Sequence, residues 1–106
     1  MTPEKQALLR RIKAAVLEIL PDATVILYGS QARGDATPES DWDILVLTDA
    51  EVTWSLRQDV WNAIYELELD TAELITSIIR NRRQWSMPPL ATTRFHENVS
   101  REGIAV

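Results

Sequence analysis

Several residue types are missing from the chain or nearly so. Its 106 residues include no cysteine, so disulfide bonds, thiolate metal ligands and a cysteine nucleophile are all excluded. This absence of thiols fits a reducing compartment, and we expect a cytoplasmic protein. The chain has one histidine, His96, which we expect to be a surface or structurally satisfied side chain.

Long hydrophobic runs are also missing. No apolar stretch approaches the length of a membrane span, and residues 1–5 lack the basic-then-apolar layout of a signal peptide. The length predicts one domain over residues 1–106. The net charge of −5 argues against a protein that coats nucleic acid, although a bound metal ion would still allow a nucleotide substrate.

Glycine is scarce, with three residues in all, yet two of them bound one short segment. Gly29 and Gly34 enclose a turn that follows an apolar run, and such a turn offers backbone N–H groups to a phosphate. A second apolar run begins just after with Asp41 and Asp43. Because side chains alternate along a strand, these carboxylates share a face roughly 7 Å apart. A divalent cation bound between them is the simplest way to neutralise the repulsion between these two charges.

The periodicity of apolar residues predicts alternating helices and strands. We expect helices over residues 2–20, 53–67 and 93–101, with short helical turns after Ser30 and over 81–87. The last helix should end at Gly103 as a left-handed capping residue. Strands are expected over residues 24–28, 42–48 and 72–79. This order predicts an α/β (α+β) fold, with a small mixed sheet and helices packed on one face.

The turn and the acidic pair together resemble a known motif. The chain reads Gly29-Ser30-Gln31-Ala32-Arg33-Gly34 and then Ser40-Asp41-Trp42-Asp43-Ile44. This is similar to the G-S-x-A-R-G…S-D-x-D motif of minimal nucleotidyltransferases of the antitoxin type, in the polymerase-beta-like superfamily. Residues 98–104 also resemble the tail of that family.

The resemblance implies transfer of a nucleoside monophosphate, AMP from ATP, to an acceptor hydroxyl. Asp41 and Asp43 would hold Mg²⁺ or Mn²⁺, which prefer oxygen ligands. Gly29 and Ser30 would bind the triphosphate. Arg33 would contact phosphate or pair with a carboxylate. The acceptor implied by the family is a tyrosine of a HEPN-type helical toxin, which the protein would counteract as an antitoxin.

Two-metal members of the superfamily carry a third carboxylate on a neighbouring strand, in a stretch similar to V-D-L-V. The nearest match is the stretch from Ala72 to Ile75, which makes Glu73 the expected third metal ligand and base. Asp70 is the other candidate, although it also suits a turn between a helix and a strand.

Each of these residues also has a purely structural interpretation. Asp41 would cap a turn, Asp43 and Glu73 would face solvent, and Ser30 would only form the turn. If no third carboxylate reaches the metal, the chain would instead be a non-catalytic module that binds nucleotide and neutralises its partner by contact. A glycosyltransferase with an Asp-x-Asp pair is a weaker alternative, because the chain is too short for the usual sugar-nucleotide domain.

Two further groups of residues leave alternatives open. Trp54, Trp61 and Tyr65 form a stripe on the helix predicted over residues 53–67. This stripe either belongs to a broad core-facing surface or is an exposed patch for a protein partner or a homodimer. Three arginines at positions 80, 82 and 83 form either a solvated cluster or a contact for an acidic partner.

Overall fold

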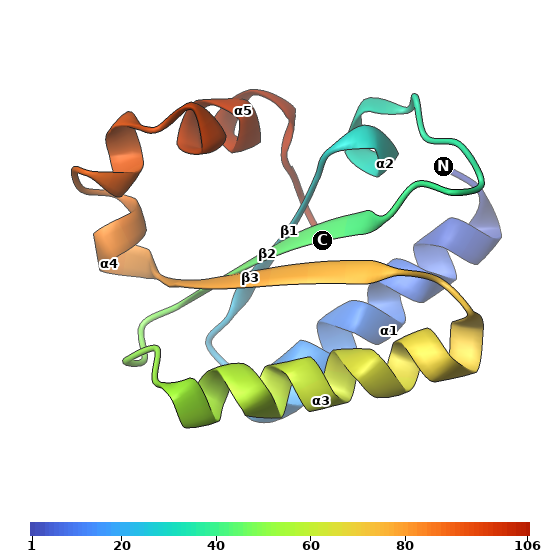
Figure 1. The fold of residues 1–106 in the computed structure, drawn as a ribbon, viewed down its shortest axis with the longest axis horizontal. Helices are drawn as coiled ribbons and strands as arrows, with labels where there is room; N and C mark the ends of the chain where they lie inside the picture. Colours follow the sequence, from blue (N-terminus) through green and yellow to red (C-terminus); the bar gives the residue numbers. More distant parts are fainter.

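A four-stranded mixed sheet, in the order β3-β2-β1-β4, forms the centre of the molecule (Figure 1). The computed structural model describes residues 1–106. The strands are β1 (Thr24–Tyr28), β2 (Trp42–Thr48), β3 (Ile75–Asn81) and β4 (Ile104–Ala105). The helices are α1 (Pro3–Ile19), α2 (Ser30–Arg33), α3 (Trp54–Thr71), α4 (Arg82–Trp85) and α5 (Arg94–Glu102), with a 3₁₀ turn at Leu90–Thr92. Strand β1 is antiparallel to β2 and β4, whereas β2 and β3 are parallel.

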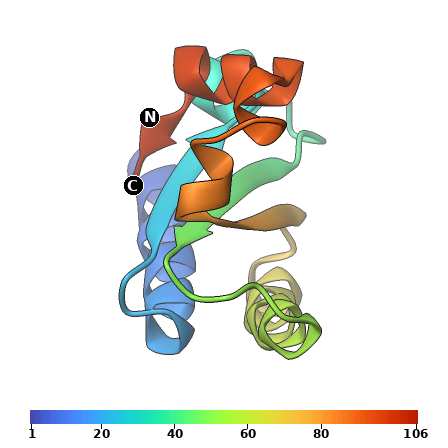
Figure 2. The same cartoon turned by 90° about the vertical axis from the view of Figure 1, so that its left-hand side faces the viewer.

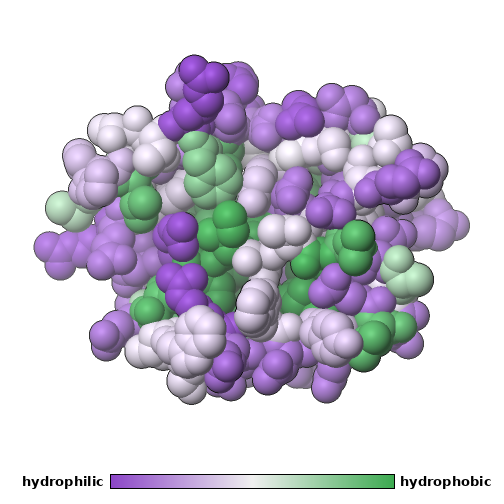
Figure 3. All heavy atoms as spheres, viewed as in Figure 1, coloured by the Kyte–Doolittle hydropathy of each residue, from purple (hydrophilic) through white to green (hydrophobic).

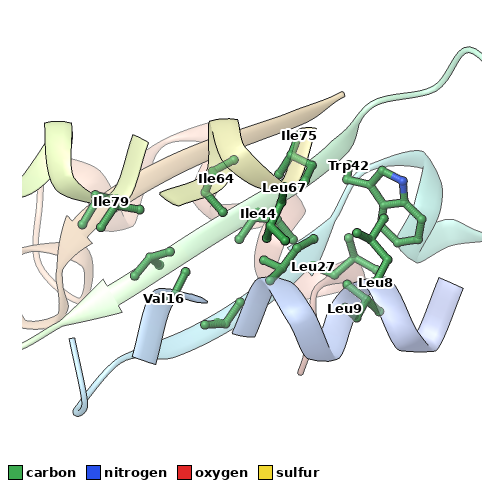
Figure 4. Close-up of a cluster of buried hydrophobic side chains, with 14 of the residues drawn as sticks. Leu8, Leu9, Val16, Leu27, Trp42, Ile44, Ile64, Leu67, Ile75 and Ile79 are labelled. Atoms are coloured by element: carbon green, nitrogen blue, oxygen red, sulfur yellow. The ribbon is translucent and has the colours of Figure 1, made fainter. Parts of the chain in front are cut away.

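The two long helices cover one face of the sheet. Helix α1 begins where the Thr2 side chain accepts a hydrogen bond from the Lys5 N–H at 3.2 Å, the N-cap that the sequence predicts. Apolar residues at helical spacing then turn inward and meet the apolar face of β1 and β2 (Figure 4). The main buried cluster includes Leu8, Ile12, Val16, Leu27, Ile44, Val46, Val60, Ile64 and Leu67.

The opposite face of the sheet carries a second, smaller layer. Leu45 and Leu47 of β2 pack there against Trp85 and Val99, which come from α4 and α5. Figure 2 shows these short helices across the sheet from α1 and α3. The predicted fold class, a mixed sheet with helices, is confirmed, and the structure adds a cover on the second face.

The start of β3 differs from the sequence prediction. Helix α3 continues to Thr71, whose hydroxyl donates to the Leu67 carbonyl at 2.7 Å, and Ala72 caps the helix with a φ of 60°. The strand therefore begins at Ile75 rather than at residue 72. This shift leaves Glu73 in the connection before the strand.

The C-terminal end also differs in detail. Helix α5 ends at Glu102, close to the predicted end, but Gly103 is extended, with a φ of −66°, rather than left-handed. Glycine is required there by space, because a Cβ would lie 2.5 Å from the Val99 carbonyl oxygen. The chain then adds the short strand β4 against β1, which the sequence did not predict.

Two other sequence expectations concern the surface. The stripe of Trp54, Trp61 and Tyr65 is exposed, so its interpretation as part of the core is wrong. No helix combines the length and the apolar character that crossing a bilayer would need.

Candidate active site

The turn after β1 presents backbone donors that have no acceptor within the protein. Gly29 has a φ of 77°, a conformation that favours glycine, and it leads directly into α2. Its carbonyl accepts hydrogen bonds from the N–H groups of Ala32 and Arg33. The N–H groups of Ser30 and Gln31 find no protein acceptor, as expected at a helix start. These groups are available to an anionic oxygen.

Asp43 lies directly against this turn. Strand β2 places Asp43 opposite Tyr28, the residue that precedes Gly29. A Cβ added to Gly29 would lie 2.2 Å from Oδ2 of Asp43. The absence of a side chain at Gly29 is therefore what lets the carboxylate and the turn approach so closely.

The electrostatics of Asp43 reflect an acidic pair. Burial raises the pKa of Asp43, and the negative charge of Asp41 raises it further. Arg33 lowers the pKa of Asp43, whereas Glu102 raises it, so this arginine offsets only part of the negative charge. Asp41 itself is exposed, just before β2. The structure thus brings Asp41 and Asp43 together beside Gly29, Ser30 and Arg33.

Glu73 does not join this group. Trp42 separates the two aspartates in the sequence. Its side chain is buried in the core beside Leu8 (Figure 4). The Trp42 indole Nε1 donates to Oε2 of Glu73 at 3.3 Å. Because Trp42 and Asp43 point to opposite faces of the sheet, Glu73 lies across the sheet from the acidic pair. The expected third carboxylate at residue 73 is therefore not brought to the site.

The remaining candidates for a third carboxylate also lie elsewhere. Asp70 forms an exposed ion pair with Arg11 at 2.6 Å. The residue beside Asp43 on β3 is Thr76, according to the parallel register. No group of three or more histidine, cysteine or acidic side chains is arranged to hold a metal ion. Of the carboxylates that the sequence analysis selected, only Asp41 and Asp43 thus lie beside the turn.

Glu102, which the sequence analysis did not select, approaches the turn from α5. Its carboxylate accepts hydrogen bonds from the Gly29 N–H at 3.2 Å and from Arg33 Nη1 at 3.1 Å. Arg33 also pairs with Asp35 at 3.2 Å, and these two carboxylates raise the pKa of its guanidinium. Residues 98–104 carried the family resemblance, but no local pattern indicated a contact across 73 residues of chain.

Tyr28 is a second neighbour that sequence reasoning missed. It shares the face of Asp43, and its ring packs edge-on against Phe95 with centroids 5.2 Å apart. Burial, together with the charge of Asp43, raises the pKa of Tyr28 to about 12. The phenol thus stays protonated beside the acidic pair and is able to donate a hydrogen bond.

The other basic and titratable candidates have partners of their own or line a separate hollow. His96 stacks on Trp85 with ring centroids 4.4 Å apart. Arg82 pairs with Asp49 and Asp22 at the opposite end of β2. The largest hollow on the surface, about 880 Å³, is lined by Arg57, Arg80 and Arg83 at that same end.

The residues beside the turn fit one hard divalent cation. Magnesium is usually held by one or two carboxylates together with substrate phosphates and water, and Asp41 and Asp43 supply such a pair. Burial first and the charge of Asp41 second raise the pKa of Asp43, so a bound cation would favour its ionised form. The close approach at Gly29 leaves a bound phosphate within reach of both elements.

Comparison with protein families matches this part of the chain to a family. Residues 9–92 match the model of the nucleotidyltransferase domain. This span includes the turn, the acidic pair and the whole of β3.

Two curated relatives come from Methanocaldococcus jannaschii. "Putative protein adenylyltransferase MJ0141" is 31% identical over 101 residues, which cover 93% of this chain and 95% of the relative. "Putative protein adenylyltransferase MJ0604" is 34% identical over 79 residues, which cover 74% of this chain and 72% of the relative.

A solved structure shares the fold at lower sequence identity. The crystal structure of a toxin–antitoxin with AMP-PNP superposes with a TM-score of 0.65 at 18% identity. The match covers 91% of this chain and 69% of the solved one. At that identity the likeness concerns the fold.

Proposed function

Since the chain belongs to the nucleotidyltransferase domain family, we propose that it transfers AMP from ATP to a hydroxyl group of a protein. One observation carries the proposal: Asp43 lies against Gly29, at a turn whose next N–H groups have no protein acceptor. Nucleotidyl transfer depends on positioning and on charge neutralisation more than on covalent chemistry. A cation site and a phosphate site in direct contact meet both needs.

The proposed roles follow from these positions. Asp41 and Asp43 hold a divalent cation, Mg²⁺ or Mn²⁺. The N–H groups of Ser30 and Gln31 bind the triphosphate, and the Gly29 backbone allows it to approach the carboxylates. When bound, the cation neutralises phosphate charge and polarises the phosphorus–oxygen bond. Arg33 holds the turn through Glu102, and it reaches phosphate only if that pair opens.

The acceptor class is inferred from the relatives. Both curated relatives are described as protein adenylyltransferases, and the structural neighbour is a toxin–antitoxin with AMP-PNP. These descriptions support a protein hydroxyl as acceptor and ATP as donor. We propose a tyrosine of a HEPN-type toxin as that acceptor, with this chain as the antitoxin.

A second function is favoured by a specific observation. Thr76, not a carboxylate, lies beside Asp43 on β3, and Glu102 is already bound to Arg33 and Gly29. With two carboxylates the cation would be held weakly. The chain would then bind nucleotide and neutralise its partner by contact alone.

Labelled ATP separates the two functions. The purified chain is incubated with Mg²⁺, ATP labelled at the α-phosphate, and the protein encoded next to it. Transfer of label to a tyrosine of that protein supports the enzyme, and a stable complex without label supports the contact mechanism. Asp43→Asn should reduce labelling at least a hundredfold, by analogy with the loss of one transition-state contact. The control Asp59→Asn, an exposed change on α3, should leave labelling unchanged.

A further inference from the structure

The outer edge of β3 is unpaired. Strand β3 lies at the end of the sheet, and its only strand neighbour is β2. The Trp42 N–H donates to the Leu74 carbonyl at 2.8 Å. In a parallel ladder with this register, the backbone N–H and C=O groups of the even-numbered residues of β3 point toward β2. Those of the odd-numbered residues point away from the sheet. The N–H of Ser77 therefore faces outward, and it has no acceptor in the protein.

Apolar side chains border this free edge. Trp54, Trp61 and Tyr65 on α3 are 67%, 61% and 58% exposed. Trp54 and Trp61 line a hollow of about 200 Å³ together with Ser77 and Ile79 of β3. Figure 3 views this face and shows hydrophobic side chains in its middle, with hydrophilic ones mostly around the rim. Natural edge strands are normally protected by charge, proline or a covering segment.

The two ends of the edge carry opposite charge. At one end Arg57, Arg80 and Arg83 line the larger hollow of about 880 Å³, and none of them forms an ion pair. At the other end Glu68 lies beside Trp61 and Tyr65, and its carboxylate accepts from the Ile75 N–H at 3.3 Å. A surface that is basic at one end and acidic at the other complements an inverted copy of itself.

We propose that the β3 edge pairs antiparallel with the β3 edge of a second copy of this chain, about a two-fold axis at Ser77. Pairing about this axis places Ile75 opposite Ile79 of the second copy, and both have outward-facing backbone groups. In the single chain the Ile75 N–H donates to Glu68 and the Ile79 carbonyl accepts from Arg80, so pairing exchanges these side-chain bonds for backbone bonds and frees Glu68. The aromatic stripes then meet each other, and Arg57 faces Glu68 of the second copy. A two-fold interface requires such self-complementarity.

The strand pairing and the helix charges each define a position for the two-fold axis, and the two positions agree along the direction of β3 and α3. Glu68 contacts Ile75, which gives a common reference level. Ser77 lies about 7 Å from Ile75 along the strand. The midpoint between Arg57 and Glu68 lies about 8 Å from Glu68 along the helix. The two centres agree to within about 2 Å.

Area and charge favour a second copy over other occupants. Fully buried aromatic side chains each bury 150–250 Å², so three that are about three-fifths exposed supply on the order of 300–450 Å². This is about half of the ~800 Å² per partner in a standard interface, and the strand edge adds more. A nucleic acid would bring phosphates against Glu68, whereas a second copy brings Arg57 there.

Sedimentation equilibrium of the full chain tests the proposal. We expect a mass of twice 12.1 kDa for the wild type at about 50 μM. Ser77→Pro removes an outward N–H without breaking the ladder to β2, and it should weaken dimerisation at least tenfold. A monomeric wild type at this concentration overturns the proposal and leaves the edge to a different polypeptide or a nucleic acid.

A charge swap supplies the sharper test. Arg57→Glu and Glu68→Lys should each weaken the homodimer at least tenfold, because each places like charges opposite one another. Mixing the two variants restores both opposite-charge contacts, so the mixture should form the dimer. Glu66→Lys, on another side of α3, is the matched control and should dimerise as the wild type does. Failure of the mixture to associate, with both variants folded by circular dichroism, overturns the proposed register.

This inference rests on the edge and its charges and not on nucleotide chemistry. Arg57, Glu68 and Ser77 lie outside the proposed catalytic group. Labelling from ATP therefore reports on the proposed function, whereas mass reports on the dimer, and either result stands without the other.

Discussion

Gly29 is the residue on which the geometry of the candidate site depends most directly. Its φ of 77° and its contact with Asp43 are both incompatible with an ordinary side chain. The sequence indicated a turn at this position but not the carboxylate above it. Sequence spacing gives no information about which later residue will face a glycine across a strand pair.

The substitution Gly29→Ala tests this contact. We expect it to lower the free energy of unfolding by about 1–3 kcal/mol, the usual range for backbone strain of this kind, and to displace Asp43 and abolish transfer. Urea unfolding and the labelling assay would measure the two effects. Gly34→Ala is the control, because its φ of 85° carries similar strain but its added Cβ meets no atom within 4 Å. Equal labelling by both variants would contradict the proposed close approach.

Asp43 is also expected to oppose folding when it is charged. Burial and Asp41 raise its pKa in the folded protein, so the protonated carboxyl is the form that folding favours. The stability from protonation is fully present below the unfolded pKa of aspartate, and it is lost as the pH rises through the higher folded pKa. Removing the charge should therefore stabilise the metal-free protein at neutral pH.

The prediction is that Asp43→Asn, without divalent cation, has a higher urea midpoint than the wild type at pH 7. The advantage should shrink as the pH falls toward 3, because the wild-type carboxyl then becomes neutral as well. Urea titrations of both proteins at a series of pH values measure this difference in midpoint. A wild type that is more stable than the variant at pH 7 would show that Asp43 already has a compensating partner.

At the scale of elements, α5 contacts the turn after β1, and β4 pairs with β1 itself. Glu102 joins the end of α5 to the Gly29 N–H and to Arg33, while β4 extends the sheet beside β1. These contacts link the last dozen residues to residues 29–33. The C-terminal segment therefore stabilises the turn itself, in addition to covering the second face of the sheet.

Glu102→Ala should consequently lower the free energy of unfolding by about 1–2 kcal/mol. This lies at the lower end of the roughly 1.5–3 kcal/mol for hydrogen bonds to charged groups, because the Arg33 side chain is partly exposed. Nucleotide affinity should fall as well, because the turn loses a contact that holds its shape. Arg101→Ala, which removes only a local contact to Asn98, is the matched control. Chemical unfolding and an ATP titration followed by Trp fluorescence provide the measurements. A near-zero effect at Glu102, equal to that of the Arg101 control, would show that the turn holds its shape unaided.

At the scale of the whole molecule, a ligand bound at the turn should stabilise the entire fold. The proposed site joins β1, β2 and α2, so a bound nucleotide links elements that must separate on unfolding. Binding at a hundred times the dissociation constant contributes about 2.7 kcal/mol. For a domain of this size that corresponds to a rise in Tm of about 10 °C or more.

We therefore expect ATP with Mg²⁺ to raise Tm, and ATP with a chelator to raise it much less. Differential scanning calorimetry measures both conditions. Asp43→Asn should abolish the difference between them, since the cation would lose a ligand. An equal rise with and without Mg²⁺ would mean that the nucleotide binds without the acidic pair.

Sequence patterns located the central elements and indicated a class of chemistry for the candidate site. Apolar periodicity located α1, β1 and β2 closely, because each buries a regular face, and the Gly29–Gly34 turn with Asp41 and Asp43 indicated nucleotide chemistry. The side of the sheet that each carboxylate occupies depends on the strand register and could not be predicted from these patterns. Glu73 lies across the sheet because the register of β3 against β2 puts Thr76 beside Asp43 and odd-numbered positions on the face of Trp42. Glu102 reaches the turn from the far end of the chain. Local patterns encode burial of a segment, whereas contacts between distant segments are set by how those segments pack.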